Sequence, residues 1–207
     1  MRAALMPLAA LAMLAACETT STQAPAPQPE AQARQMALAQ NPPMRWSQRN
    51  GADAWTKATL TALDREGVAI MSRVPSDIDA YCPNYPQLTQ TGRRAFWAGL
   101  LSALAKHEST YNPKASGGGG RWLGLMQIAP ATWRNYGCDG NIKNGGDNMA
   151  CAVKIMSRQV GRDNAVARSD GHWRGVARDW APMRNPKKRA DIAAWTSSQS
   201  YCQPKEG

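Results

Sequence analysis

One carboxylate in this sequence stands where a helix would ordinarily carry an apolar residue. The large apolar side chains of residues 93–110 recur every three or four positions, which predicts a helix with one buried face. They are Phe96, Trp97, Leu100, Leu101 and Leu104. Glu108 follows four residues after Leu104, on the same face. Because burial disfavours an unpaired charge, it raises the pKa of a carboxyl group, as a general acid near neutral pH requires. A glutamate at a helix end that turns outward into solvent is the alternative.

The residues after Glu108 favour the catalytic interpretation. Residues 108–113 read Glu-Ser-Thr-Tyr-Asn-Pro, and a glycine run and the segment Gly-Leu-Met-Gln-Ile at 124–128 follow. Pro130 and Thr132 come next, where a short helix is expected to begin. This combination resembles the signature of the SLT-type lytic transglycosylases.

The resemblance implies a mostly α, lysozyme-like fold and a single catalytic residue. Glu108 would protonate the glycosidic oxygen of the β-1,4 bond between N-acetylmuramic acid (MurNAc) and N-acetylglucosamine (GlcNAc). The substrate's N-acetyl group would replace the second carboxylate that most glycosidases use. Glu108 would then act as base on the muramoyl 6-hydroxyl, giving 1,6-anhydroMurNAc without consuming water. No metal or cofactor is implied.

The same resemblance assigns supporting roles to residues near Glu108. Ser109 would orient the glutamate or the substrate's acetamido group, whereas Met126 and Gln127 would line the saccharide groove. A helix-end hydroxyl that satisfies backbone groups is the alternative for Ser109. Core packing is the alternative for Met126.

Tryptophans are candidates for stacking on sugar rings, although most tryptophans lie in protein cores. Trp122 follows the glycine run 117–120, which we interpret as a mobile lip of the groove, so Trp122 is a candidate substrate-binding residue. Trp133, Trp173 and Trp195 are expected in the core.

The family usually has a tyrosine in an Ala-Tyr-Asn-x-Gly segment that holds the catalytic glutamate, and this chain has none. Residues 177–184 read Ala-Arg-Asp-Trp-Ala-Pro-Met-Arg at the corresponding place. Either Trp180 or Arg184 lines the groove there, or Tyr136 or Tyr201 supplies the contact from elsewhere.

Two other functions remain open beside the transglycosylase. If Asp179 lies beside Glu108, a hydrolytic muramidase on the same fold is favoured. If Glu108 is ionised and paired with Lys106 or Lys114, a non-catalytic peptidoglycan-binding lipoprotein is favoured.

Helices account for most of the elements expected to position these residues. Start and stop residues predict helices over 54–66, 91–110, 131–136, 149–160, 173–179 and 188–195. Alternating β-branched residues are almost absent, so little or no β-sheet is expected.

The N-terminal residues predict export and attachment to a membrane. Residues 1–16 have a charged start, a short apolar run and small residues before Cys17, as in a lipoprotein signal peptide. Acylation of Cys17 would anchor the chain in a membrane, and Glu18 favours the periplasmic side of the outer membrane. An ordinary secretory signal beside an incidental cysteine is the alternative. Residues 17–50 are rich in Pro, Ala and Gln and are expected to form a disordered tether, with the catalytic domain at 51–207.

The remaining cysteines and the charge fit an exported protein that acts on an anionic polymer. An even number of cysteines in an exported chain suggests two disulfides, with three possible connectivities. We favour Cys138 with Cys151, which would close a short Gly/Asn-rich loop, and Cys82 with Cys202, which would tie the last residues to the domain. Zinc ligation is the less favoured alternative, since no two cysteines have close ligand spacing. The net charge of +10 fits peptidoglycan and the membrane surface as partners, while export excludes nucleic acid. The sequence names no protein partner.

Overall fold

The computed structural model describes residues 29–204. The predicted signal peptide, 1–16, and the predicted lipidation site, Cys17, lie outside these residues. Within 29–204, none of the helices combines the length and the apolar character that crossing a bilayer requires.

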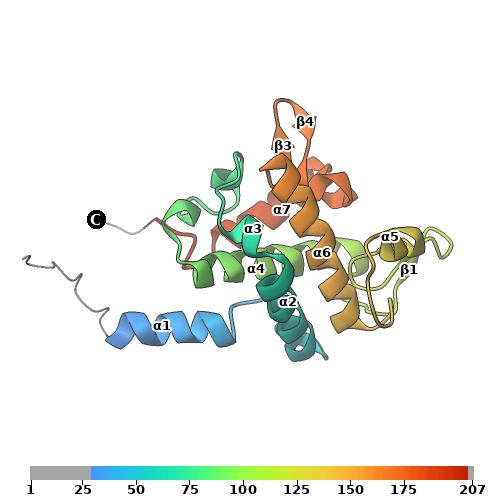
Figure 1. The fold of residues 1–207 in the computed structure, drawn as a ribbon, viewed down its shortest axis with the longest axis horizontal. Coiled ribbons are helices and arrows are strands. Elements are labelled where there is room, and N and C mark those ends of the chain that lie inside the picture. Colours follow the sequence, from blue (N-terminus) through green and yellow to red (C-terminus); the bar gives the residue numbers. More distant parts are fainter. Residues whose placement is uncertain (1–28, 205–207) are drawn as a thin grey trace, which may run out of the picture.

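The described chain is mostly α-helical, as the sequence predicts (Figure 1). Its α-helices are α1 (Pro29–Gln40), α2 (Ala52–Glu66), α3 (Val68–Met71), α4 (Gln90–Ser109), α5 (Pro130–Asn135), α6 (Gly145–Asp163) and α7 (Pro186–Ser197). Short 3-10 helices are η1 (Ile78–Ala80), η2 (Tyr85–Gln87), η3 (Gly175–Arg178) and η4 (Ala181–Met183).

Two small antiparallel hairpins complete the described part of the fold. Strand β1 (Ser116–Gly117) pairs with β2 (Trp122–Leu123), and β3 (Arg168–Ser169) pairs with β4 (His172–Trp173). Ser116 lies opposite Leu123 in the first hairpin, and Arg168 lies opposite Trp173 in the second.

Helix α4 is the centre of the core and contacts α1, α2, α3 and α7. Every residue from Ala95 to Ala105 is buried, so the helix is covered on all sides along this stretch. Near its start, Phe96 and Trp97 pack edge-to-face with Tyr85, and the Trp97 indole N–H donates to the Tyr85 hydroxyl at 2.9 Å. This packing fixes the orientation of α4 and therefore the position of its C-terminal turn.

The largest departures from the predicted helices are at α6 and at residues 173–179. Helix α6 begins at Gly145 and continues through Gly161 to Asp163, because Asn144 caps it and Asn164 ends it with a φ of 47°. The prediction of an α-helix over 173–179 is wrong. Trp173 lies in β4, and only Gly175–Arg178 forms a 3-10 turn.

The last part of the predicted tether belongs to the folded domain. Residues 29–40 form α1, and Met44 and Trp46 are buried with exposed fractions of 5% and 0%. The Trp46 indole N–H donates to the Thr56 hydroxyl at 2.9 Å, and its ring packs edge-on against Trp55. Burial of a large aromatic ring holds the surrounding residues against the core. The folded domain therefore begins before residue 51.

Both favoured disulfides are formed, Cys82 with Cys202 and Cys138 with Cys151. The first ties the C-terminal residues to the body, where the Asn84 amide N–H also donates to the Cys202 carbonyl at 3.1 Å. In the described part of the chain, no group of three or more metal-ligating side chains is placed to hold a metal.

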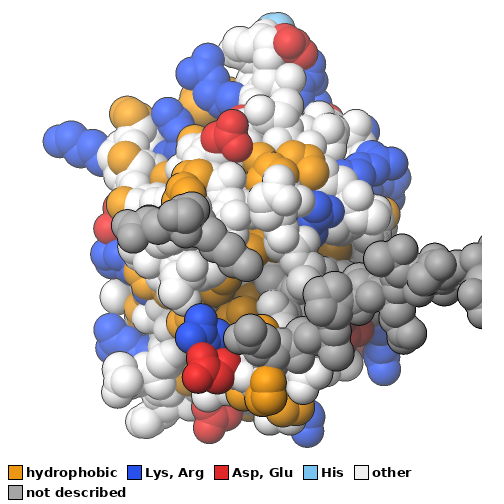
Figure 2. Space-filling view, turned by 90° about the vertical axis from the view of Figure 1, so that its left-hand side faces the viewer, with side chains coloured by type: hydrophobic (Ala, Val, Ile, Leu, Met, Phe, Trp, Pro, Cys, Tyr) orange, Lys and Arg blue, Asp and Glu red, His pale blue; other side chains and the backbone are white. Residues whose placement is uncertain are grey.

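Basic side chains are spread over the surface. On the face drawn in Figure 2 they lie in separate groups, with acidic and apolar side chains between them. The charge excess is therefore not gathered into one patch on this face.

Candidate active site

Glu108 lies in the last turn of α4, just before a strained turn of the backbone. Thr110 and Tyr111 have successive positive φ values of 53° and 65°, which is unusual for residues other than glycine. The Asn112 amide N–H donates to the Ser109 carbonyl at 3.1 Å and closes this turn. The chain therefore leaves the helix abruptly after Glu108. Strained backbone of this kind clusters at functional sites.

The Glu108 carboxyl group is half-buried and has no partner within residues 29–204. It forms no hydrogen bond and no salt bridge there, and the Lys106 ammonium instead contacts Asp191 at 3.3 Å. Burial raises the pKa of Glu108 to about 7, against the opposing effect of the Lys188 and Arg184 charges. The ion pair with Lys106 or Lys114 that would favour a binding-only protein is not formed among these residues.

Asp191 of α7 holds the end of α4 in place. Its carboxylate accepts two hydrogen bonds from the Arg45 guanidinium, at 2.6 and 2.9 Å, and contacts the His107 Nε2 at 2.6 Å. The Arg45 guanidinium, followed by His107, holds the pKa of Asp191 well below its usual range. His107 thus faces α7 and is a neighbour of Glu108, not its partner. No local sequence pattern predicts this cluster.

The Gly-Leu-Met-Gln segment is held from two sides. The buried Asn148 of α6 accepts a hydrogen bond from the Met126 amide N–H at 2.8 Å and donates to the Ile142 carbonyl at 2.8 Å. A Cβ at Gly124 would lie 2.3 Å from the Asn148 amide nitrogen, so only glycine fits there. On the other side, the Trp180 indole N–H donates to the Met126 carbonyl at 3.0 Å.

These contacts correct two predicted substrate-binding residues. Met126 has an exposed fraction of 0% and Trp180 one of 3%. Neither side chain is open to a glycan strand in this structure, because both fill the core behind the segment. Both pack next to the backbone that precedes Gln127.

Gln127 and Ser109 remain candidates with defined local contacts. Gln127 is half-buried, has a φ of 46°, and its amide donates to the Gly124 carbonyl at 2.9 Å. Its Oε1 faces Gly117, where a Cβ would lie only 2.3 Å away. The Ser109 hydroxyl is 3.4 Å from the Ala105 carbonyl, which is the helix-end alternative noted above.

The tryptophans divide into exposed and packed ones. Trp122 is 43% exposed and lies over Gly118, with the Arg121 guanidinium 4.9 Å from its ring centroid. Trp173 is 36% exposed on β4, so its assignment to the core is wrong. Trp133 and Trp195 are partly buried and pack against the core.

Within residues 29–204, neither alternative tyrosine forms a hydrogen bond with Glu108. The Tyr201 hydroxyl faces the Ala95 carbonyl at 3.4 Å, and the Tyr136 hydroxyl accepts from Gln159 at 3.2 Å. Asp179 also accepts from the Gln159 amide. In the 177–184 segment, the Arg184 charge lowers the pKa of Glu108. The Arg184 guanidinium donates to the Ala177 and Arg178 carbonyls.

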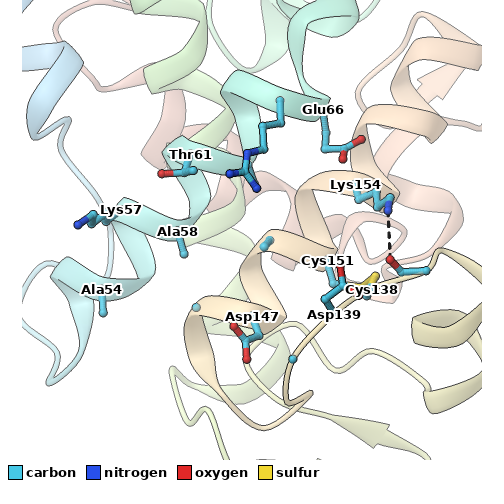
Figure 3. A pocket seen from close by; sticks show the side chains of 16 residues that line it. Ala54, Lys57, Ala58, Thr61, Glu66, Cys138, Asp139, Asp147, Cys151 and Lys154 are labelled. Atoms are coloured by element: carbon cyan, nitrogen blue, oxygen red, sulfur yellow. Dashed lines mark hydrogen bonds between the residues drawn. A yellow bond between two sulfur atoms is a disulfide. The ribbon is translucent and has the colours of Figure 1, made fainter.

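A groove of about 690 Å³ lies between α2, α6 and the Cys138–Cys151 disulfide, away from these residues (Figure 3). Alanine and glycine residues line much of it. Both basic and acidic side chains contribute charges, namely Lys57, Arg65, Lys154, Glu66, Asp139 and Asp147. The Lys154 ammonium donates to the Gly137 carbonyl at 3.1 Å. No predicted catalytic or substrate-binding residue lines this groove.

Residues 88–177 match the family model of the transglycosylase SLT domain. This segment contains Glu108, Ser109 and the Gly-Leu-Met-Gln segment, and the match indicates an enzyme of the transglycosylase type that acts on peptidoglycan. No curated protein sequence matches the chain.

Solved structures of one protein, Bd0314 DslA, resemble this fold. A glutamate-to-glutamine mutant of Bd0314 DslA is 28% identical, with a TM-score of 0.72, over 78% of this chain and 98% of that chain. The wild-type form is 27% identical with a TM-score of 0.71, over 78% of this chain and 98% of that chain. The described chain therefore has the single-domain, mostly α, lysozyme-like fold that the sequence predicts.

Proposed function

We propose that this chain is a peptidoglycan lytic transglycosylase that cleaves the MurNAc–GlcNAc β-1,4 bond with Glu108 as its single acid and base. The observation that carries the proposal is the half-buried Glu108 carboxyl group, whose pKa is about 7 and which has no partner within residues 29–204. It lies in the segment that matches the SLT domain.

The chemistry uses one carboxyl group for two proton transfers. Protonated Glu108 donates its proton to the glycosidic oxygen as the bond to the muramoyl C1 breaks, while the substrate's N-acetyl oxygen attacks that carbon. The Glu108 carboxylate then takes the proton of the muramoyl 6-hydroxyl, whose oxygen displaces the acetamido oxygen and forms the 1,6-anhydro ring. No water is consumed.

The charges of Lys188 and Arg184 stabilise the ionised form of Glu108 that exists between the two proton transfers. Between the two proton transfers the glutamate is ionised in a half-buried place, which is unfavourable. The two cations lower this penalty and keep the pKa close to neutral, where a group can both donate and accept a proton.

We further propose that the mature chain is held by lipid on Cys17 at the periplasmic side of the outer membrane. The support for this is the signal peptide and cysteine pattern of residues 1–17 and the Glu18 that follows. Peptidoglycan strands are the polymer within reach of such an anchor.

Mass spectrometry of peptidoglycan digests tests the proposed reaction. The mature chain should release anhydromuropeptides, and Glu108→Gln should lower their yield by about a thousandfold, which is in the range for loss of a general acid–base. The wild-type rate should fall as the pH rises through about 7, because Glu108 loses its proton there. Reducing-end products would instead indicate a muramidase, and binding without products would indicate a non-catalytic protein.

The raised pKa also predicts how stability depends on pH. The folded chain keeps the Glu108 proton up to about pH 7, whereas the unfolded chain releases it near 4.5. Stability should therefore fall as the pH rises between these values. Glu108→Gln should remove this loss and stabilise the fold by roughly 3 kcal/mol at pH 8, and by almost nothing at pH 4. Urea denaturation at the two pH values measures the difference, and an equal effect at both would contradict the raised pKa.

A further inference from the structure

The β3–β4 hairpin carries an aromatic ring contacted by two arginines. The Arg168 guanidinium lies 4.9 Å from the Trp173 ring centroid, and the Arg189 guanidinium of α7 lies 5.1 Å from it. Stacking on an aromatic ring orients a guanidinium without using its N–H groups. We call Arg168, Trp173 and Arg189 the hairpin patch.

The two guanidiniums keep most of their hydrogen-bond donors available. Arg168 donates to the Gly171 carbonyl at 3.1 Å, and Arg189 donates to the Met183 carbonyl at 3.0 Å. Neither forms a salt bridge with any residue between 29 and 204. Asp170 at the hairpin tip accepts from the Ser169 hydroxyl. Because an arginine has five N–H donors, the patch retains donors for an anionic ligand.

The base of this hairpin is fixed, although its strands are only two residues long. The Asp77 carboxylate accepts from the amide N–H groups of Val166, Ala167 and Arg168 at 2.6, 2.8 and 2.8 Å. Across the base, the Gly175 amide N–H donates to Asp163 at 2.7 Å. Figure 1 shows that the hairpin projects from the body of the molecule. The fold thus holds an exposed cationic platform in a defined position.

Helix α7 links the hairpin patch to the surroundings of Glu108. Lys188, which acts on the Glu108 carboxyl group, immediately precedes Arg189 in the first turns of α7. Their Cα atoms are therefore about 3.8 Å apart. One turn of α7 presents a cation to Glu108 and a second cation to Trp173. The patch and a cation near Glu108 are thus carried by neighbouring residues of one helix.

We infer that the hairpin patch binds the carboxylates of the peptide stem on a glycan strand held at Glu108. The inference rests on the proposed function and specifies its substrate as strands that still carry their peptides. Free carboxylates are the anionic groups of these stems, and guanidiniums bind them through paired N–H donors. Peptide-free strands offer the same sugars to Glu108 but nothing to the patch.

A comparison of strands with and without peptides tests the inference. Binding is measured in the full-length Glu108→Gln protein, with soluble strands that either retain their stems or have lost them to an amidase. Arg168→Gln/Arg189→Gln is introduced into this background. The matched control is Lys57→Gln/Arg65→Gln, which removes two exposed charges from α2 in the separate groove. Thermal melting checks that every variant is folded.

Glu108→Gln alone should bind peptide-bearing strands about tenfold more tightly than peptide-free ones, the scale of one or two charge-assisted contacts. The patch variant should lose this preference and the control should keep it. The preference of Glu108→Gln alone should also shrink at high salt, because exposed charges are screened.

Three results would overturn the inference. Glu108→Gln alone could bind both strand types equally, or its preference could survive in the patch variant, or the preference could survive at high salt. A patch variant that loses binding only to anionic phospholipid vesicles would also overturn it, since the ligand would then be a membrane. These binding measurements do not depend on turnover, whereas absence of Glu108-dependent products would count against the proposed function alone.

Discussion

The two β-hairpins are alike in size but differ in what holds them. Each has two-residue strands, and each displays an exposed tryptophan with a guanidinium 4.9 Å from its ring centroid. The β3–β4 hairpin is fixed at its base by the carboxylate of Asp77. The β1–β2 hairpin turns through three glycines with positive φ, Gly118 to Gly120, and its base is closed by a backbone hydrogen bond from Gly124 to Ala115 at 3.0 Å.

The β3–β4 hairpin is therefore held rigidly, whereas the β1–β2 hairpin is adaptable. Glycine allows many backbone conformations, so the β1–β2 hairpin can adjust beside Gln127. Three hydrogen bonds to one carboxylate leave the β3–β4 hairpin little freedom. Similar secondary structure thus has different mechanical properties, because the anchors lie outside the hairpins.

Removal of the Asp77 anchor should have the largest effect on this comparison. Asp77→Ala leaves three backbone N–H groups without their acceptor, and we expect a loss of about 3 kcal/mol in the free energy of unfolding. Urea denaturation measures the loss, and hydrogen exchange should show faster exchange at Val166 to Arg168. Asp170→Ala at the exposed hairpin tip is the control and should change stability by less than about 0.5 kcal/mol. Similar losses in both variants would refute the special role of Asp77.

Two glycine substitutions should sharpen the comparison at an intermediate scale. A Cβ at Gly175 would lie 1.9 Å from the Ala165 carbonyl oxygen, whereas a Cβ at Gly119 would meet nothing within 4 Å. Both glycines have positive φ, 49° and 69°, so both substitutions pay the left-handed penalty of about 1 kcal/mol. Gly175→Ala should lose at least about 2 kcal/mol, because the backbone must also shift. Thermal melting that ranks the two variants equally would contradict the rigid base.

The smallest difference is expected from the tryptophans themselves. Trp173→Ala removes contacts with two guanidiniums and should cost about 1 kcal/mol, whereas Trp122→Ala removes one and should cost about half as much. Both rings are substantially exposed, so neither change leaves a large cavity. Chemical denaturation under the same conditions decides the order. A larger loss for Trp122→Ala would mean that the glycine hairpin is the better anchored one.

Sequence periodicity predicted what lies along one helix and missed what lies between elements. The place of Glu108 followed from the apolar spacing of α4, because residues four apart share a helix face. Asn148 and Asp191 could not be found this way, because they act on segments 22 and 84 residues away in the chain. Their residue types carry no local signal of those contacts.

The same limit explains the errors on buried residues. Met126 and Trp180 were predicted to face the substrate, but a motif does not tell which side of a groove wall a side chain occupies. Trp46 was placed in the tether because residues 17–50 are rich in Pro, Ala and Gln, although Met44 and Trp46 are buried there. In each case burial was decided by residues distant in sequence.

The bond between Cys82 and Cys202 also determines what a protease can separate. The two cysteines are 120 residues apart and enclose α4, both hairpins, α6 and α7. A single cut anywhere between them leaves two pieces that are still covalently joined. Such a nicked molecule would migrate at full mass on a non-reducing gel and split only after reduction. A cut in the exposed glycine loop would therefore leave both fragments, with Glu108 on one and Lys188 on the other, attached to each other.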